Sequence, residues 1–180
     1  MKNFFYILLL FLSPSLWAHP HLWIDVDLNF TSSGLLHVHW TFDEYFSSDM
    51  ILNYDVNRND ILEQNEQDEI NRIVFRNMIN YDYFLDIVRD GKKVDIPLAS
   101  NFKASIKNHK LIYDFDVPLK QSWNDMEIIP WDKTYFADMR LTSCPDSIPG
   151  TNVTVIQEKL KRDTLGWGTI EVPGVFLKEN

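Results

Sequence analysis

Residues 21–42 read HLWIDVDLNFTSSGLLHVHWTF, and this stretch decides the fold. Every second residue is apolar over His21–Phe30, and the same alternation returns over Leu35–Phe42. Strict alternation is typical of β-strands that bury one face. The residues between the two runs, Thr31–Gly34, are typical of a turn and include a glycine for a left-handed position. The stretch therefore predicts a β-hairpin.

The length of that turn decides which side chains face the core. Across a three-residue loop both apolar sets share one face, so that His37 and His39 lie on the polar face. A two-residue loop would shift the register by one position and bury both histidines. We therefore predict the three-residue loop, with His37 opposite Asn29 and His39 opposite Asp27.

Helical spacing of apolar residues follows the hairpin, and strand patterns fill the remainder of the chain. We predict a short helix over Asp43–Asn53 and a longer one over Glu63–Tyr81. The further expected strands are Tyr83–Arg89, Phe102–Ile106, Leu111–Val117, Met126–Ile129, Thr134–Arg140 and Asn152–Gln157, and Leu165–Phe176 could be strand or coil. The order predicts a single α+β domain over residues 19–180. It is an antiparallel β-sandwich or curled sheet with an EF-hand-like helix-loop-helix inserted at about residues 43–81, after the first hairpin.

Composition narrows the class of protein. The 180 residues carry a formal net charge of −9, which argues against a nucleic-acid partner, since such a partner requires a basic face. A hydrophobic content of 45% is ample for a packed core and argues against disorder. Cys144 is the one cysteine, so neither an internal disulfide nor a multi-thiolate zinc cluster is expected.

The first 18 residues are typical of a secretory signal peptide. A short basic start precedes the apolar run Phe4–Leu12, and a break at residues 13–15 leads to a cleavage site after Ala18. The run is too short to span a bilayer, which takes roughly 20 residues. A retained membrane anchor is the alternative, but no second apolar stretch extends the run. We expect a periplasmic protein that begins at His19 and has no transmembrane segment in its mature chain.

The sharpest local motif resembles the calcium loop of an EF-hand, about 12 residues long. Its ligand positions hold Asp55, Asn57, Asn59, Ile61 (through its carbonyl), Glu63 and Glu66. The departure is Asp60, which occupies the position where glycine normally takes a positive φ. Two Asn in place of Asp also lower the ligand charge, so we expect weak calcium affinity. The alternative is that Asp60 and Glu63 form a capping box that opens the second helix.

A second candidate site is a histidine cluster. Four of the five histidines, His19, His21, His37 and His39, lie in or just before the first hairpin, close to Asp25 and Asp27. Imidazoles near carboxylates suit Ni²⁺, Co²⁺, Zn²⁺ or copper. The alternative is a solvent-facing strand surface that binds no metal. No catalytic residue is predicted, because no nucleophile motif or phosphate-binding glycine loop occurs.

Five segments together resemble an uncharacterised family of bacterial periplasmic proteins. They are His19–Asp25, Trp40–Ser47, the calcium-type loop, Tyr81–Phe84 and Trp131–Phe136. The family is catalogued as the periplasmic component of an ABC-type transport system and often accompanies nickel/cobalt-type transporters. This sequence departs from its pattern at Asn57, Asn59 and Asp60, and at Lys133, where the family has Pro.

These observations lead to one main hypothesis and two alternatives. We expect a non-enzymatic periplasmic accessory or metal-binding component of a transition-metal transport system, with a membrane metal transporter as its partner. The first alternative is a secreted metalloenzyme that uses His19 as a metal ligand. The second is a calcium-stabilised structural module without a transport role.

Overall fold

The computed structural model describes residues 20–180. The predicted signal peptide, its cleavage site after Ala18 and the candidate ligand His19 lie outside the described residues. Within residues 20–180, no helix is long and apolar enough to cross a membrane.

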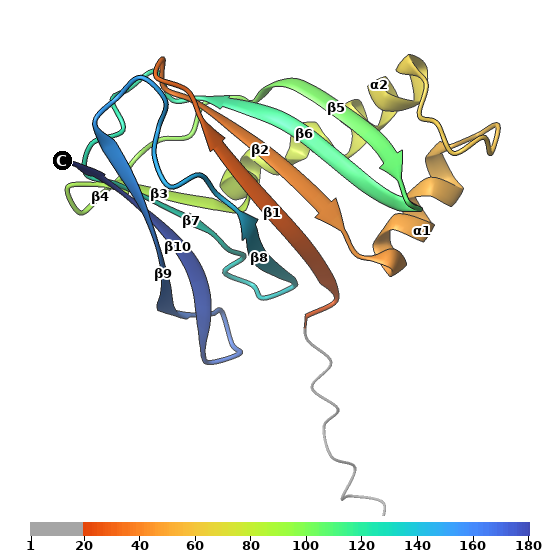
Figure 1. Ribbon diagram of the computed structural model, residues 1–180. Helices are drawn as coiled ribbons and strands as arrows, with labels where there is room; N and C mark the ends of the chain where they lie inside the picture. Colours follow the sequence, from red (N-terminus) through yellow and green to blue (C-terminus); the bar gives the residue numbers. More distant parts are fainter. Residues whose placement is uncertain (1–19) are drawn as a thin grey trace, which may run out of the picture.

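Two five-stranded sheets form the body of the protein (Figure 1). The first has the order β5-β6-β2-β1-β8, with bounds Ser100–Lys107, Lys110–Pro118, Leu35–Phe42, Leu22–Phe30 and Ala137–Ser143. The second has the order β4-β3-β7-β10-β9, with bounds Lys92–Lys93, Leu85–Arg89, Met126–Pro130, Thr169–Glu179 and Val153–Asp163. All pairs are antiparallel except β1 with β8, which is parallel. Two sheets with helices confirm a sandwich-like α+β fold.

The helices follow the first hairpin, as predicted, and lie near β5 and β6 (Figure 1). They are α1 over Glu44–Tyr54, α2 over Gln64–Ile73 and the 3₁₀ helix η2 over Phe75–Phe84. Asp43 caps α1, because its Oδ1 accepts the backbone N–H groups of Tyr45 and Phe46. The amide N–H of Leu111 on β6 donates to the Ser47 hydroxyl, which anchors α1 to the sheet.

The hairpin of β1 and β2 has the predicted three-residue loop and register. The backbone N–H of Thr31 donates to the carbonyl of Leu35, and His37 and His39 pair with Asn29 and Asp27 respectively. Gly34 is required in the loop, since its φ is +79° and a Cβ there would lie 2.7 Å from the Gln121 carbonyl oxygen.

One core joins the two sheets and the helices. The apolar residues of β1 and β2 pack in the same buried cluster as Ile87, Ile128 and Val175 of the second sheet. Trp40 is fully buried at its centre, with its ring 5.0 Å from that of Phe115. This burial forces the alternate residues of β2, including both histidines, onto the outer face of the first sheet.

The helix predicted over Glu63–Tyr81 is wrong beyond Ile73. There the side-chain amide of Asn77 donates to the Ile73 carbonyl, and the backbone N–H of Asn77 donates to Val74 instead. A side chain that takes the carbonyl of residue i−4 competes with the helical backbone, so the α-helix gives way to a 3₁₀ turn. Stacking of Phe75 on Phe102, at 4.1 Å between ring centroids, fixes the new path.

Several strand bounds also differ from those predicted. β8 begins at Ala137, not at Thr134, because the Asp132 carboxylate accepts the backbone N–H groups of Thr134, Phe136 and Ala137 and holds a loop there. β9 continues to Asp163, and the predicted strand or coil at Leu165–Phe176 contains a turn before β10 begins at Thr169. The second predicted hairpin is confirmed, with Lys107 paired to Lys110 across Asn108 and His109.

Candidate functional site

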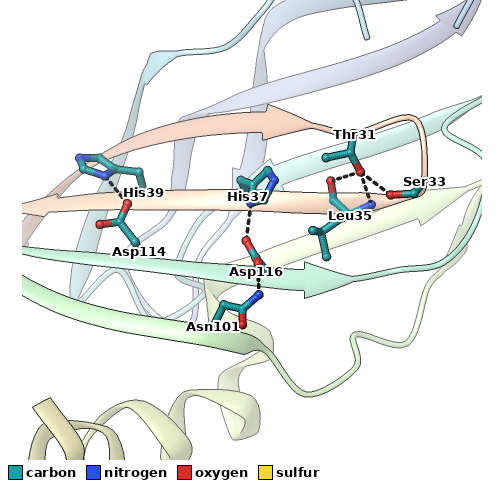
Figure 2. Close-up of polar contacts among 8 residues, drawn as sticks. All are labelled: Thr31, Ser33, Leu35, His37, His39, Asn101, Asp114 and Asp116. Carbon is teal, nitrogen blue, oxygen red and sulfur yellow. Dashed lines mark hydrogen bonds and ion pairs between the residues drawn. The ribbon is translucent and has the colours of Figure 1, made fainter. Parts of the chain in front are cut away.

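The outer face of the first sheet carries the strand histidines. The hydroxyl of Thr31 accepts the backbone N–H of Leu35 at 3.1 Å and bonds the Ser33 hydroxyl at 2.8 Å, which holds the turn that sets the register (Figure 2). The register places His37 and His39 on β2 opposite carboxylates of β6, as Figure 2 shows.

His39 is oriented from both of its ring nitrogens. Its Nδ1 lies 2.7 Å from Oδ1 of Asp114, and its Nε2 lies 3.3 Å from the Thr41 hydroxyl. With the ring proton on Nδ1, the carboxylate accepts and Nε2 is left as an electron-pair donor. About a third of the His39 side chain is exposed, so the ring is held but remains accessible.

His37 has the same hydrogen bond from Nδ1 to a carboxylate of β6, and that carboxylate is more buried than Asp114. Its Nδ1 is hydrogen-bonded to Oδ1 of Asp116, whose Oδ2 accepts the side-chain amide of Asn101 at 2.7 Å. Asn101 reaches Asp116 because β5 has an irregular register between Ser100 and Lys103, where Asn101 takes a φ of +54°. Asn101 therefore fixes the position of the Asp116 carboxylate, and the carboxylate in turn orients the imidazole of His37.

This arrangement suits transition-metal binding. A histidine that ligates a metal usually donates its other ring N–H to a carboxylate, which fixes the tautomer and raises the basicity of the ligating nitrogen. Both histidines have that carboxylate, and they border an open hollow of about 290 Å³. Asp27 of β1 borders the same hollow and accepts the Thr142 hydroxyl at 2.6 Å. His37 and His39 are about 7 Å apart by strand rise, which is long for one ion.

The described residues do not bring the predicted histidine cluster together. His21 lies six positions before Asp27 on the same face, which is about 20 Å away along an extended strand. Its ring packs 5.4 Å from that of Phe136. Within residues 20–180, no group of three or more His, Cys, Asp or Glu side chains is placed to hold a metal ion. The hollow thus offers two imidazoles with a carboxylate beside them.

The calcium-type loop connects α1 to α2, and its side-chain oxygens hold its shape by accepting hydrogen bonds from its own backbone. Asp55 is buried, and its carboxylate accepts the backbone N–H groups of Asn59 and Asp60 at 3.2 and 2.9 Å. Asp60 has a φ of +61°, as glycine has at that position of calcium loops. Leu62 is buried, so its position fixes the loop against the core.

The side chain of Glu63 links two asparagines in the middle of the loop. Its Oε1 accepts the side-chain amides of Asn59 at 2.8 Å and Asn57 at 3.2 Å. Hydrogen bonding to Asn59 first, and then to Glu66 and Asn57, lowers the pKa of Glu63 to about 2, so the carboxylate stays ionised. Its Oε2 is shielded from solvent and has no hydrogen-bond partner among the described residues. An ionised oxygen of this kind fits a hard cation such as Ca²⁺.

Glu66 has a double role that the sequence did not predict. It is buried, and its two oxygens accept the backbone N–H groups of Val56 and Glu63 at 2.8 and 3.0 Å. The capping box of α2 therefore consists of Glu63 and Glu66, and the predicted box of Asp60 and Glu63 is wrong. The remaining predicted ligand, Ile61, donates its N–H to Oδ1 of Asn59. A bound cation would have to displace the bonds that Glu66 now makes.

Sequence reasoning missed the carboxylate partners of the strand histidines, Asp114 and Asp116. It also missed Asn101, which donates to Asp116, and Thr142, which donates to Asp27. The alternation of Asp114 and Asp116 along the predicted strand was a signal that two carboxylates share one face. Nothing local indicated that this face adjoins the histidines. Cys144 takes no part, since burial first, and then Asp146, raise the pKa of its thiol to about 12.

Comparisons with known proteins place this geometry in a family without an established activity. The family model described as "Protein of unknown function (DUF1007)" matches residues 4–156. An uncharacterized protein of Haemophilus influenzae is 30% identical over 154 residues, which cover 79% of this chain and 72% of that protein. An uncharacterized 15.5 kDa protein in the trpE 3′ region of Spirochaeta aurantia is 28% identical over 93 residues, covering 50% of this chain and 66% of that protein. No solved structure matches.

Proposed function

The chain belongs to the DUF1007 family of proteins of unknown function, and we propose that it is a non-enzymatic, periplasmic metal-binding component of a transition-metal transport system. The observation that carries the proposal is the pair of strand histidines, each hydrogen-bonded through Nδ1 to a carboxylate of β6. Imidazole is a good ligand for Ni²⁺, Co²⁺, Zn²⁺ and copper.

A role in delivery agrees with the openness of the hollow. Structural metal sites are closed by four protein ligands, whereas exchange requires open coordination positions. The hollow is lined by Asp27, Asp114 and Asp116 as well as the histidines. Those carboxylates, with a formal net charge of −9 over the chain, raise the local concentration of cations. A membrane metal transporter is the partner that such a protein would serve.

Metal titration of the mature protein, residues 19–180, tests the proposal. We expect saturable Ni²⁺ or Zn²⁺ binding by calorimetry, weakened about tenfold or more in His39→Ala and in His37→Ala. His109→Ala is the matched control, because His109 is an exposed histidine beside a single carboxylate, Asp60, at 3.9 Å. Equal losses in all three variants would show generic surface binding and overturn the proposal.

The location and the enzyme alternative have tests of their own. Mass spectrometry of the exported protein should find His19 as the first residue, and an uncleaved chain would refute the predicted signal peptide. Copper that survives native purification, together with oxygen-dependent turnover lost in His19→Ala, would favour the secreted metalloenzyme instead.

The calcium loop supports a second candidate function, stabilisation of the fold by Ca²⁺. The observation that favours it is the shielded Oε2 of ionised Glu63, which has no hydrogen-bond partner among the described residues, in a loop whose Asp55 and Glu66 carboxylates are buried. No Lys or Arg forms an ion pair with these three groups among the described residues. Such a role is compatible with metal binding on the first sheet.

A further inference from the structure

The two aromatic and acidic segments that the sequence analysis singled out meet at one cavity. Tyr81–Phe84 ends η2, and Trp131–Phe136 connects β7 to β8. The backbone N–H of Trp131 donates to the Phe84 carbonyl at 2.9 Å, which joins the segments. They enclose a cavity of about 290 Å³, close to the smallest sites that hold small molecules.

Aromatic and aliphatic side chains line this cavity. Tyr81 is 59% exposed, and its ring centroid lies 6.0 Å from that of half-buried Phe84. Trp131 and Leu165 also line it. The residues Asp82, Tyr83 and Phe84 all have positive φ, of 52°, 50° and 50°. Consecutive left-handed residues are costly, and strain of this kind is concentrated at binding sites.

The charges around the cavity leave one carboxylate unpaired. Asp132 is saturated by its own loop, since it accepts from the backbone N–H and hydroxyl of Thr134 and from two further N–H groups. Asp82 is bound by Lys93, whose Nζ lies 2.6 Å from its Oδ2. The carboxylate of Asp86, half-buried on β3, makes no hydrogen bond or close ion pair with any residue in the range 20–180, although it attracts the Lys93 ammonium from further away. Lys133 is exposed, so water solvates its ammonium.

We propose that this cavity binds a small organic cation, an amine whose ammonium group faces Asp86 and whose apolar body lies against Tyr81 and Phe84. A carboxylate and aromatic rings together favour a cation, because the ring faces carry negative charge and the carboxylate supplies directional attraction. The site is separate from the histidine face and from the calcium-type loop, since the three share no lining residue.

Lys93 limits the affinity of this site. Its pKa is raised by its hydrogen bond to Asp82 first, and then by attraction from Asp82, Asp86 and Asp95, so it remains charged. A ligand ammonium must enter beside this charge. Removing the Lys93 charge should therefore strengthen the binding of a cation. If Lys93 had only a structural role, its loss would not strengthen binding.

Calorimetric titration of the mature protein with three probes of similar shape provides the test. Benzylammonium should bind saturably, while benzyl alcohol and benzoate should bind at least about tenfold more weakly. Asp86→Asn should weaken benzylammonium about tenfold or more, and Lys93→Gln should tighten it severalfold. Asp95→Asn is the control, because Asp95 lies near Lys93 but does not line the cavity.

Four results would overturn the proposal. They are equal binding of benzyl alcohol, preference for benzoate, no saturable benzylammonium binding below about 10 mM, and unchanged affinity in Asp86→Asn. Thermal melting establishes that each variant folds. If Asp86→Asn fails to fold, the Lys93→Gln variant decides between the outcomes. Weakened or unchanged benzylammonium binding in that variant contradicts the proposal.

Discussion

The calcium-type loop and the histidine face bring their candidate ligands together in opposite ways. The loop takes its oxygens from twelve consecutive positions, Asp55–Glu66, between two helices. The histidine face takes its nitrogens from β2 and their orienting carboxylates from β6, 75 and 79 residues further along the chain. The first is a property of a short segment, whereas the second exists only once the sheet has formed.

The two regions also differ in what they contribute to the fold. The oxygens of Asp55 and Glu66 are buried and each holds two backbone N–H groups. His37 and His39 are partly exposed and hold side chains only. The oxygens of the loop therefore hold the local backbone together, while the histidines of the face hold no backbone group within residues 20–180.

The largest expected effect separates the two regions by stability. Asp55→Ala leaves the backbone N–H of Asp60 without an acceptor and that of Asn59 with Asn57 alone, and we expect a loss of about 2–3 kcal/mol in the free energy of unfolding. His37→Ala should cost less than about 1 kcal/mol, since the pair is partly exposed and Asp116 keeps its bond to Asn101. Urea unfolding measures both, with Asp49→Ala as an exposed control on α1. Equal losses would erase the distinction.

The same distinction explains how much of the fold the sequence predicted. The first hairpin, its register and the second hairpin depend on alternation and turn residues within about twenty positions, and all three are confirmed. The end of α2 depends on Asn77 and on the stacking of Phe75 against a distant strand. The parallel pairing of β1 with β8 joins segments over a hundred residues apart, and no local pattern encodes it.

The candidate sites differ in the same way: local spacing predicts the residues of one, and only the strand order reveals the partners in the other. Ligand spacing identified the loop, and the structure gives Asp60 the left-handed φ that this position needs in a calcium loop. The cap of α2 was misassigned because Asp60 and Glu63 have the same spacing as Glu63 and Glu66. The hairpin placed His37 and His39 correctly on the outer face, but their carboxylate partners come from β6 and could not be predicted without the strand order.

Calcium provides the second test. For a dissociation constant of about 10⁻⁴–10⁻³ M, about 10 mM Ca²⁺ should stabilise the native state by about 1.4–2.7 kcal/mol and raise the melting temperature by about 3–10 °C. Glu66→Gln should abolish the rise, whereas Asp68→Asn, an exposed carboxylate on α2, should keep it. Comparing each variant with and without Ca²⁺ removes the effect of the lost cap. No rise in the unmutated protein would leave the loop with a capping role only.

The third test compares how metal binding in the two regions depends on pH. Ni²⁺ or Zn²⁺ affinity should fall as the solution is acidified, because imidazole must be neutral to bind. The pKa of Glu63 is lowered from 4.5 to about 2, so its ionised form contributes fully above 4.5 and is lost as the pH falls toward 2. The calcium-dependent rise in melting temperature should therefore persist to about pH 5. Loss of transition-metal binding and of the calcium effect over the same pH range would indicate one shared site.

The smallest expected effect compares two left-handed residues, one in each region. Asp60 has a φ of +61°, and within residues 20–180 its side chain makes no hydrogen bond but lies 3.9 Å from His109 Nδ1. Asn101 has a φ of +54°, and its side-chain amide donates to Asp116. Glycine adopts this conformation without a Cβ clash, so Asp60→Gly should stabilise the protein by about 0.5 kcal/mol and Asp60→Ala should destabilise it by about 1 kcal/mol. Asn101→Gly gains the same relief but loses its bond to Asp116, so we expect no net gain there. Glu63 caps α2, and both substitutions at position 60 remove the contact with His109, so the difference between glycine and alanine there reports on φ. If glycine and alanine at position 60 behave alike, or if Asn101→Gly stabilises as Asp60→Gly does, the left-handed backbone is not what distinguishes the two regions.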